Sequence, residues 1–309
     1  MSNNGDIMYI VDMHCDSLTR VAGDTGLVGS HNFSGRYPQL QFAAAFVPKG
    51  KRTLQERKAE LMQYFNVYLS EKERLGLLGV RSSEDVYRFE EDELRSTLFS
   101  VEGGAGLMPD SKELMLLASG GLAVLGMAWD TNELATSAWD KNDTGLTSLG
   151  KEMVRRCDSL GIISDVSHLS DKSFYDLMDT SGYPVLATHS NFRDICPSPR
   201  NLTRDMAKMI VARGGVIGIN LYPEFLREDG ACTEDIVRHV DYALENFGDS
   251  SIGFGFDIDG TEDRYPLGIR TDVSIHDQVI ELLLGRYSVE TVEKIAGKNV
   301  MNFLKSNLS

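Results

Sequence analysis

The chain has 309 residues, and its 46 acidic residues outnumber its 31 basic residues, which gives a formal net charge of −15. This balance argues against nucleic-acid binding and membrane-surface proteins, because both need a basic face. The apolar fraction of 42% is typical of a folded globular protein. Since no repeat, low-complexity tract or Pro-rich linker interrupts the chain, we expect one domain over residues 1–309.

The sequence shows no sign of export or membrane anchoring. Its N-terminus, MSNNGDIMYIVDMHCD, has neither the basic segment nor the long apolar core of a signal peptide. The uncharged apolar stretch over residues 114–129 is too short to span a bilayer. The four cysteines form no C-x-x-C pair, which favours reduced thiols. We therefore expect a soluble cytoplasmic protein.

Eight short apolar runs lie along the chain, and each is rich in Val, Ile, Leu, Ala or Phe without strict polar alternation. Runs of this kind are typical of strands that are buried on both faces. They cover residues 8–14, 40–47, 97–102, 122–129, 161–168, 184–189, 215–222 and 252–257.

Helical patterns lie between these runs. The segment 47–97 is long enough for two helices and carries Leu61 and Phe65 at helical spacing. Thr203 and Thr233 each precede an apolar helical pattern that ends at glycine, so we expect both threonines to be N-caps. This alternation predicts an α/β protein with a (β/α)8 TIM barrel. An open doubly wound sheet is the alternative, but no Gly-rich phosphate-binding segment follows the first run.

Polar and metal-capable side chains stand at the ends of most of these runs. Because the C-terminal ends of barrel strands meet at one face, we expect these side chains to converge. In an extended segment, His14 and Asp16 point to the same side and Cys15 points away, which favours a buried core thiol over a nucleophile. Mixed nitrogen and oxygen donors suit zinc, and Mn or Co would also accept them. The strand-end residues are His14, Asp16, Glu102, His168, His189, Asn220 and Asp257.

A single histidine at a strand end is more often structural than a metal ligand, so the prediction depends on the joint pattern. We expect Asp12 to orient His14 through the other ring nitrogen. The remaining histidines do not share the strand-end position. We expect His239 and His276 on helix surfaces, whereas His31 lies in the first loop and could belong to either class.

Seven segments together resemble the membrane (renal) dipeptidase family. They occur in that family's order and span nearly the whole chain. The resemblance implies a (β/α)8 barrel that is related to the amidohydrolases, contains two zinc ions and hydrolyses dipeptides. The segments are VDMHCDSL, SVEGG, DVSHLS, ATHSN, PSPRNLTRDMAKMIVARGGVIGINLYPEFL, GFGFDIDG and AGKNVMNFL.

The resemblance also assigns metal ligands by position. His14 and Asp16 match the ligands of one zinc ion, and Glu102 matches the carboxylate that bridges both ions. His168 and His189 match the ligands of the second ion. These roles are expectations from the family pattern.

Further positions match substrate contacts. Arg200 matches the arginine that holds the substrate's C-terminal carboxylate, and Asp257 matches the aspartate near its amino group. Tyr222 matches a tyrosine of the substrate pocket. The chain departs from the family where many members have a histidine that contacts the scissile carbonyl: Trp129 stands there, although Asn132 is kept.

The expected activity is hydrolysis of dipeptides, including L-Xaa-D-Xaa, by a hydroxide held between two zinc ions, with Glu102 and Asp257 as catalytic carboxylates. Trp129 leaves open another small amide substrate, such as a lactam, a cyclic amide or an N-acyl amino acid. A third possible function is a non-catalytic metal-binding barrel. The complete set of metal ligands argues against it. The expected partner is a small peptide, and a homodimer follows from the resemblance alone.

Overall fold

The computed structural model describes residues 8–18, 33–50, 52–104 and 106–308. Strands and helices alternate along these residues, and the strands are short and parallel. The strands are β1 (Ile10–Cys15), β2 (Gln39–Phe46), β3 (Leu78–Gly79), β4 (Ser96–Glu102), β5 (Leu122–Gly126), β6 (Ile163–Asp165), β7 (Leu186–Ala187), β8 (Val216–Ile219) and β9 (Ile252–Phe254).

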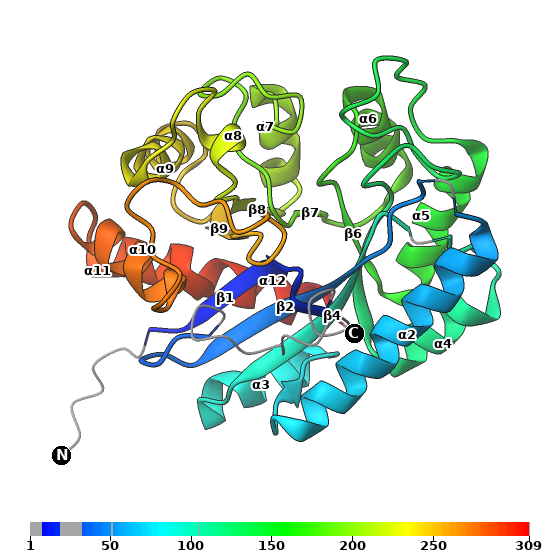
Figure 1. Cartoon of the computed structure of the whole chain (residues 1–309), viewed down its shortest axis with the longest axis horizontal. Helices are drawn as coiled ribbons and strands as arrows, with labels where there is room; N and C mark the ends of the chain where they lie inside the picture. The colour runs from blue at the N-terminus through cyan, green and yellow to red at the C-terminus, as the bar shows by residue number, and fades with distance from the viewer. Residues whose placement is uncertain (1–7, 19–32, 51, 105, 309) are drawn as a thin grey trace.

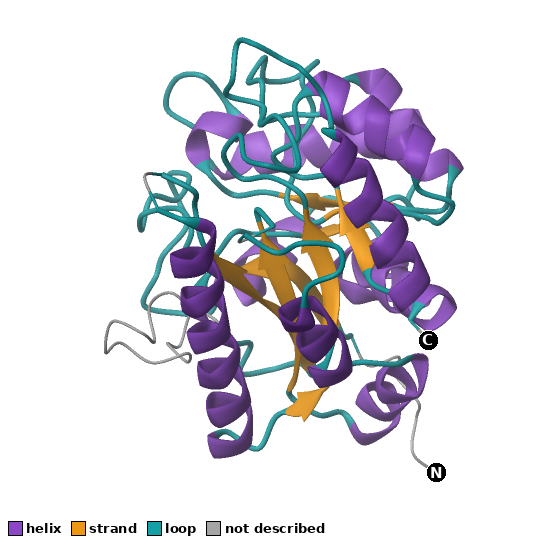
Figure 2. Cartoon of the chain, turned by 90° about the vertical axis from the view of Figure 1, so that its right-hand side faces the viewer, coloured by secondary structure: helices purple, strands orange, loops and turns teal. Residues whose placement is uncertain are grey.

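Eight of these strands close into a barrel. The order β2-β1-β9-β8-β7-β6-β5-β4 is continuous, and pairing of β2 with β4 completes the ring. The short strand β3 pairs with β4 and was not predicted. Helices surround the strands on the outside (Figures 1 and 2). The closed parallel barrel confirms the predicted (β/α)8 fold, and each predicted apolar run overlaps one barrel strand.

The helices occupy the segments between the strands, and two of them lie in residues 47–97, as predicted. Within the described residues, none of the helices has both the length and the apolar composition needed to cross a bilayer. The helices are α2 (Leu54–Arg74), α3 (Ser83–Asp92), α4 (Lys112–Gly120), α5 (Ser148–Leu160), α6 (Asp171–Thr180), α7 (Arg204–Ala212), α8 (Pro223–Leu226), α9 (Thr233–Phe247), α10 (Ile275–Leu284), α11 (Val289–Glu293), the π-helical turn η1 (Lys294–Lys298) and α12 (Asn299–Asn307).

Local sequence explains where these helices begin. Thr203 caps α7 as predicted, because its side chain accepts a hydrogen bond from the backbone N–H of Met206. The predicted cap at Thr233 is one residue late. The N-cap of α9 is Cys232, because the Asp235 carboxylate accepts the backbone N–H of Cys232 at 3.0 Å.

The core lies inside the barrel and between the barrel and its helices. In the outer layer, Phe65 and Tyr68 of α2 pack on Phe99 of β4, with ring centroids 5.0 and 4.9 Å apart. The predicted helical spacing therefore points the apolar face of α2 at the sheet.

The connections differ at the two ends of the barrel. At the N-terminal ends of the strands they are short: Gly121 alone separates α4 from β5. At the C-terminal ends they are long, as in residues 127–147, 188–203 and 255–274. The long connections therefore gather around the strand ends where the predicted site residues stand.

Candidate metal centre

His14 lies among three carboxylates at the C-terminal end of the barrel. Its Nε2 is 3.5 Å from Asp16 Oδ2, 3.9 Å from Glu102 Oε1 and 3.9 Å from Asp257 Oδ1. These side chains come from β1, from the end of β4 and from the segment after β9, and all four are buried. The barrel therefore brings together residues that are far apart in the sequence.

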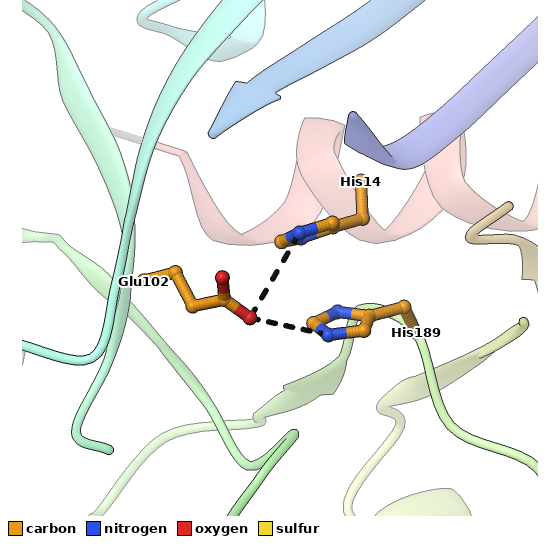
Figure 3. A group of neighbouring side chains, drawn as sticks. All are labelled: His14, Glu102 and His189. Atoms are coloured by element: carbon orange, nitrogen blue, oxygen red, sulfur yellow. Dashed lines mark ion pairs between the residues drawn. The ribbon is translucent and has the colours of Figure 1, made fainter. Parts of the chain in front are cut away.

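Two further histidines meet the same carboxylate. Glu102 Oε1 lies 2.7 Å from His168 Nε2 and 3.3 Å from His189 Nε2, and the two imidazole nitrogens are 2.8 Å apart. Figure 3 shows Glu102 beside His14 and His189, with one carboxylate oxygen facing both rings. All five predicted metal ligands thus lie in one cluster, with the three histidines around Glu102 and Asp16 beside His14.

The donor set fits divalent cations. Two ligands about 2.0–2.1 Å from a tetrahedral zinc ion stand about 3.4 Å apart, close to the observed 3.5 Å between His14 and Asp16 and 3.3 Å between His189 and Glu102. Ligand atoms of His14, Glu102 and His189 lie within 4.8 Å of one another, as do those of His14, Asp16 and Asp257. Among the described residues, the buried His14 Nε2 and Glu102 Oε1 have no hydrogen-bond partner. Unpartnered buried polar atoms of this kind are what a bound cation would satisfy.

The carboxylates change the protonation of His14. Burial alone would lower the pKa of His14, but the negative charges of Glu102, Asp16 and Asp257 raise it to about 10. Burial raises the pKa of Asp16 to about 7 and also raises the pKa of Asp257. Burial would raise the pKa of Glu102 too, but the charge of His14 and the contact with His189 lower it. These carboxylates therefore need positive charge beside them to ionise together.

The pKa values of the other two histidines, His168 and His189, are shifted in the opposite direction. Burial lowers the pKa of His168, and the charges of Arg200 and His14 lower it further. Burial and the charge of His14 likewise lower the pKa of His189, although Glu102 opposes this. Both rings are therefore held neutral, which is the form that binds metals.

A hydrogen-bond chain orients His189. Thr188 Oγ1 donates to Asp165 Oδ2 at 2.6 Å and lies 2.8 Å from His189 Nδ1. Because the hydroxyl proton goes to Asp165, Nδ1–H of His189 donates to the hydroxyl, and Nε2 is the nitrogen left to bind a cation. Sequence reasoning missed Asp165 and Thr188; an acid at the end of β6 was the available signal.

Asp257 is held in an unusual backbone conformation. Its φ is 61°, in the left-handed region that non-glycine residues rarely adopt, and Asn220 Nδ2 donates to its Oδ2 at 3.0 Å. The sequence places Asn220 at a strand end but indicates no role for it. Gly260 follows closely, and a Cβ there would collide with the carboxylates of Asp16 and Asp257. The backbone thus keeps space open beside both acids.

Arg200 is a buried cation at the edge of this cluster. It is 3% exposed, and its Nη2 donates to the backbone carbonyl of His189 at 3.2 Å. Burial lowers its pKa, whereas Asp257, Glu102 and Asp165 raise it. Within the described residues its Nε has no partner, and no carboxylate forms an ion pair with it. Such a guanidinium can accept a carboxylate from a ligand.

Aromatic rings border the cluster. Trp129 is 37% exposed, and its ring lies 6.1 Å from that of His168 and 4.7 Å from that of Phe46. The half-buried Tyr222 packs on Phe225 with ring centroids 4.7 Å apart, and the Arg200 guanidinium lies 5.3 Å from the Phe225 ring. Both predicted aromatic residues therefore stand at the rim, Trp129 beside a histidine and Tyr222 next to the ring that Arg200 covers.

Asn132 does not fit the predicted role in substrate binding. Its Nδ2 donates to the carbonyls of Gly103 and Met127 at 3.0 and 3.1 Å. Its Oδ1 accepts the backbone N–H groups of Leu134 and Ala135 at 2.8 and 3.3 Å. These four bonds use the hydrogen-bonding capacity of the amide, so Asn132 stabilises the turn after β5.

Three further expectations need correction or lie outside the structure. Asp12 contacts the backbone N–H of His14 at 3.3 Å and does not orient its ring. His239 and His276 are fully buried rather than on helix surfaces, because His239 bonds to backbone groups and His276 bonds to Asp12. His31 lies outside the described residues.

Cys15 is a buried thiol that points away from the cluster. Its Sγ lies 2.7 Å from Ser17 Oγ, and burial raises its pKa well above the ordinary value. A thiol with a raised pKa is a poor nucleophile, as expected from the alternation along β1.

Comparison with known proteins identifies relatives of this barrel. Residues 34–307 match the family model described as membrane dipeptidase (peptidase family M19). An uncharacterised protein from the pqqA 5′ region of Klebsiella pneumoniae is 31% identical over 238 residues, which are 73% of this chain and 87% of that protein. Dipeptidase tcpJ of Claviceps purpurea is 31% identical over 72% of this chain, but the match spans only 53% of that dipeptidase.

Two solved structures share nearly the whole architecture. A metallo peptidase from Rhodobacter sphaeroides, liganded with a phosphinate mimic of the dipeptide L-Ala-D-Ala, has a TM-score of 0.88 and 24% identity, and covers 98% of this chain and 100% of its own. Dipeptidase AC, a family M19 metallo peptidase, has a TM-score of 0.87 and 25% identity, and covers 98% of this chain and 99% of its own.

Proposed function

This chain belongs to the membrane dipeptidase family, peptidase family M19, and from that premise we propose that it hydrolyses dipeptides with two zinc ions bound at the end of the barrel. One observation carries the proposal: a buried cluster of imidazole and carboxylate donors lies next to Arg200, a buried guanidinium without an ion-pair partner among the described residues. The first feature suits a metal, and the second suits the carboxylate of a short peptide.

The five metal ligands are divided between two ions in this proposal. His14 and Asp16 would hold one ion, His168 and His189 the other, and Glu102 would bridge both. The separations of 3.5 Å between His14 and Asp16 and of 3.3 Å between His189 and Glu102 support this. When bound, such ions polarise an amide carbonyl and lower the pKa of water to about 7. Mn or Co would suit the same donors.

The remaining charged groups would read the two ends of the substrate. Arg200 would bind the C-terminal carboxylate, and Asp257 would bind the α-ammonium group or accept a proton during the reaction. Glu102 and Asp257 are therefore the proposed catalytic carboxylates. Because both termini are read, a dipeptide fits and a longer peptide does not. L-Ala-D-Ala, which the ligand of the Rhodobacter enzyme mimics, is the first substrate to test.

Trp129 and Tyr222 would line the substrate pocket. Trp129 offers an apolar ring beside His168, so another small amide, such as a lactam, a cyclic amide or an N-acyl amino acid, is the second candidate substrate class. Only a dipeptide has both an ammonium and a carboxylate for Asp257 and Arg200. Kinetics with a dipeptide, its N-acetyl derivative and a lactam separate the two classes.

We also propose a single-domain protein that works in the cytoplasm as a homodimer. The four free cysteines support a reducing compartment. Size-exclusion chromatography with light scattering tests the dimer.

The decisive experiment combines a dipeptide panel with metal analysis of the same sample. We expect about two zinc ions per chain, turnover of L-Xaa-D-Xaa dipeptides, and loss of turnover after chelation that added zinc restores. Dipeptide amides and N-acetyl dipeptides serve as controls, because each lacks one charged terminus. A metal-replete protein that hydrolyses no dipeptide would refute the proposal.

A further inference from the structure

A buried histidine outside the metal centre is tied to the strand that carries His14. His276 Nε2 lies 2.8 Å from Asp12 Oδ2, and both side chains are 0% exposed. His276 belongs to the first turn of α10, whereas Asp12 lies on β1, 264 positions earlier. Since an ionised carboxylate only accepts hydrogen bonds, Nε2–H of His276 is the donor.

Asp12 stands at an irregularity of β1. Asp12 pairs with Gln41 and Cys15 pairs with Ala43, so three steps along β1 match two steps along β2. Bulges of this kind re-aim side chains and are common next to active sites. They also leave a backbone N–H without its ladder partner. Here Asp12 Oδ1 accepts the N–H of His14 at 3.3 Å.

The same carboxylate oxygen holds a second strand end. Asp12 Oδ1 accepts the backbone N–H of Phe256 at 3.0 Å, and Phe256 directly precedes Asp257. One carboxylate therefore fixes the backbone at His14 and the backbone that carries Asp257. These two side chains are 3.9 Å apart across the metal centre.

Two phenylalanine rings, Phe254 and Phe256, lie next to the His276 ring. The His276 ring stacks on Phe256, with centroids 5.0 Å apart and planes 27° apart. Its Nδ1 has no hydrogen-bond partner within the described residues. An apolar ring of similar size would avoid that buried unpartnered atom, so the bond to Asp12 is the contact that distinguishes histidine at this position.

We infer that His276 is a positioning residue for the metal centre. By holding Asp12, it stabilises the bulge that aims His14 and the strand end that presents Asp257. The inference rests on the proposed metal-dependent function, but its test measures zinc affinity of the chain without substrate.

The test compares two polar substitutions of different reach. In His276→Gln the amide nitrogen can reach the place of Nε2, whereas in His276→Asn it falls short. Zinc is titrated into the metal-free chain against a chromogenic chelator. We expect His276→Gln to bind zinc within about threefold of the wild type, and His276→Asn to bind one of the two ions about 10- to 100-fold more weakly. His239→Asn, at an equally buried histidine bonded to backbone groups, is the matched control and should lower Tm without changing zinc affinity.

Each result decides the inference. Equal zinc affinity of His276→Asn and the wild type would show that His276 supports only the fold, and would overturn it. If His276→Asn does not fold, Asp12→Asn takes its place: a loss of about 10-fold or more in zinc affinity is expected, and unchanged affinity overturns the inference. Failure of the wild-type chain to bind zinc would instead overturn the metal-dependent function itself.

Discussion

The two halves of the metal centre shift the pKa of histidine in opposite directions. The acidic half, from β1 and the segment after β9, contains His14, Asp16 and Asp257, and the imidazole half, after β6 and β7, contains His168 and His189. The pKa of His14 is raised to about 10, whereas the pKa values of His168 and His189 are lowered well below their ordinary value.

The neighbours of each ring explain this difference. Burial lowers the pKa in all three cases, but only His14 has three carboxylates close enough to reverse the effect. In the imidazole half, the positive charges of Arg200 and His14 add to the effect of burial on His168. The acidic half thus attracts a cation by charge, whereas the imidazole half offers neutral lone pairs. The charged side chains next to each histidine therefore determine whether its ring is protonated or neutral.

Glu102 belongs to both halves, so its replacement has the largest expected effect. We expect Glu102→Gln to lower kcat/KM for dipeptides by about 10³-fold, because the stabilisation a metal centre supplies is several kcal/mol. Steady-state kinetics and zinc analysis measure the effect, with Glu152→Gln on the exposed surface of α5 as control. Activity of Glu102→Gln close to the wild type would contradict the bridging role.

Each half can also be broken separately. We expect Asp16→Asn and His168→Asn each to leave about one zinc ion per chain and to lower kcat/KM about 100-fold, as loss of metal-site groups typically does. Asparagine suits position 168 because it tolerates the left-handed backbone, where φ is 67°. Elemental analysis after gel filtration measures the zinc content. If both variants keep two ions, the division into two halves is wrong.

Arg200 tests how the imidazole half takes part in substrate binding, because its guanidinium donates to the backbone carbonyl of His189. We expect Arg200→Ala to raise KM for dipeptides about 10- to 100-fold, since a hydrogen-bonded charge contributes about 1.5–3 kcal/mol. The kcat should change much less. A dipeptide amide supplies the control: because it lacks the carboxylate, its KM should be nearly equal for Arg200→Ala and the wild type. A dipeptide KM that is insensitive to the substitution would show that another group binds the carboxylate.

The strand-end residues could be predicted because the barrel topology brings all C-terminal strand ends to one face. Because the eight apolar runs predict barrel strands, they also predict that His14, Glu102 and His189 meet at one face. The role of Asn132 could not be predicted, because an amide after a strand looks the same whether it binds a ligand or closes a turn. The Asp12–His276 contact was equally hidden, since it joins residues 264 positions apart and leaves no periodic signal.

The smallest expected effect concerns His239, which lies outside both halves. Its pKa shows the effect of burial without the carboxylates of the metal centre. Burial lowers the pKa of His239 from 6.5 to about 4, without the three carboxylates that surround His14. In the unfolded chain this histidine takes up a proton as the pH falls below about 6.5, whereas in the folded chain it stays neutral down to about 4. The contribution of His239 to the free energy of unfolding, about 3 kcal/mol at most, should therefore be fully present above pH 6.5 and be lost as the pH falls from 6.5 to 4.

The difference between the wild type and His239→Gln isolates that contribution, because other titrating groups are common to both chains. Urea unfolding of the metal-free proteins at several pH values between 7 and 4 measures it. We expect the stability advantage of the wild type over His239→Gln to shrink steadily through this range. An advantage that does not change with pH would mean that His239 titrates alike in the folded and unfolded chains, and burial alone would then not explain the low pKa values of the imidazole half.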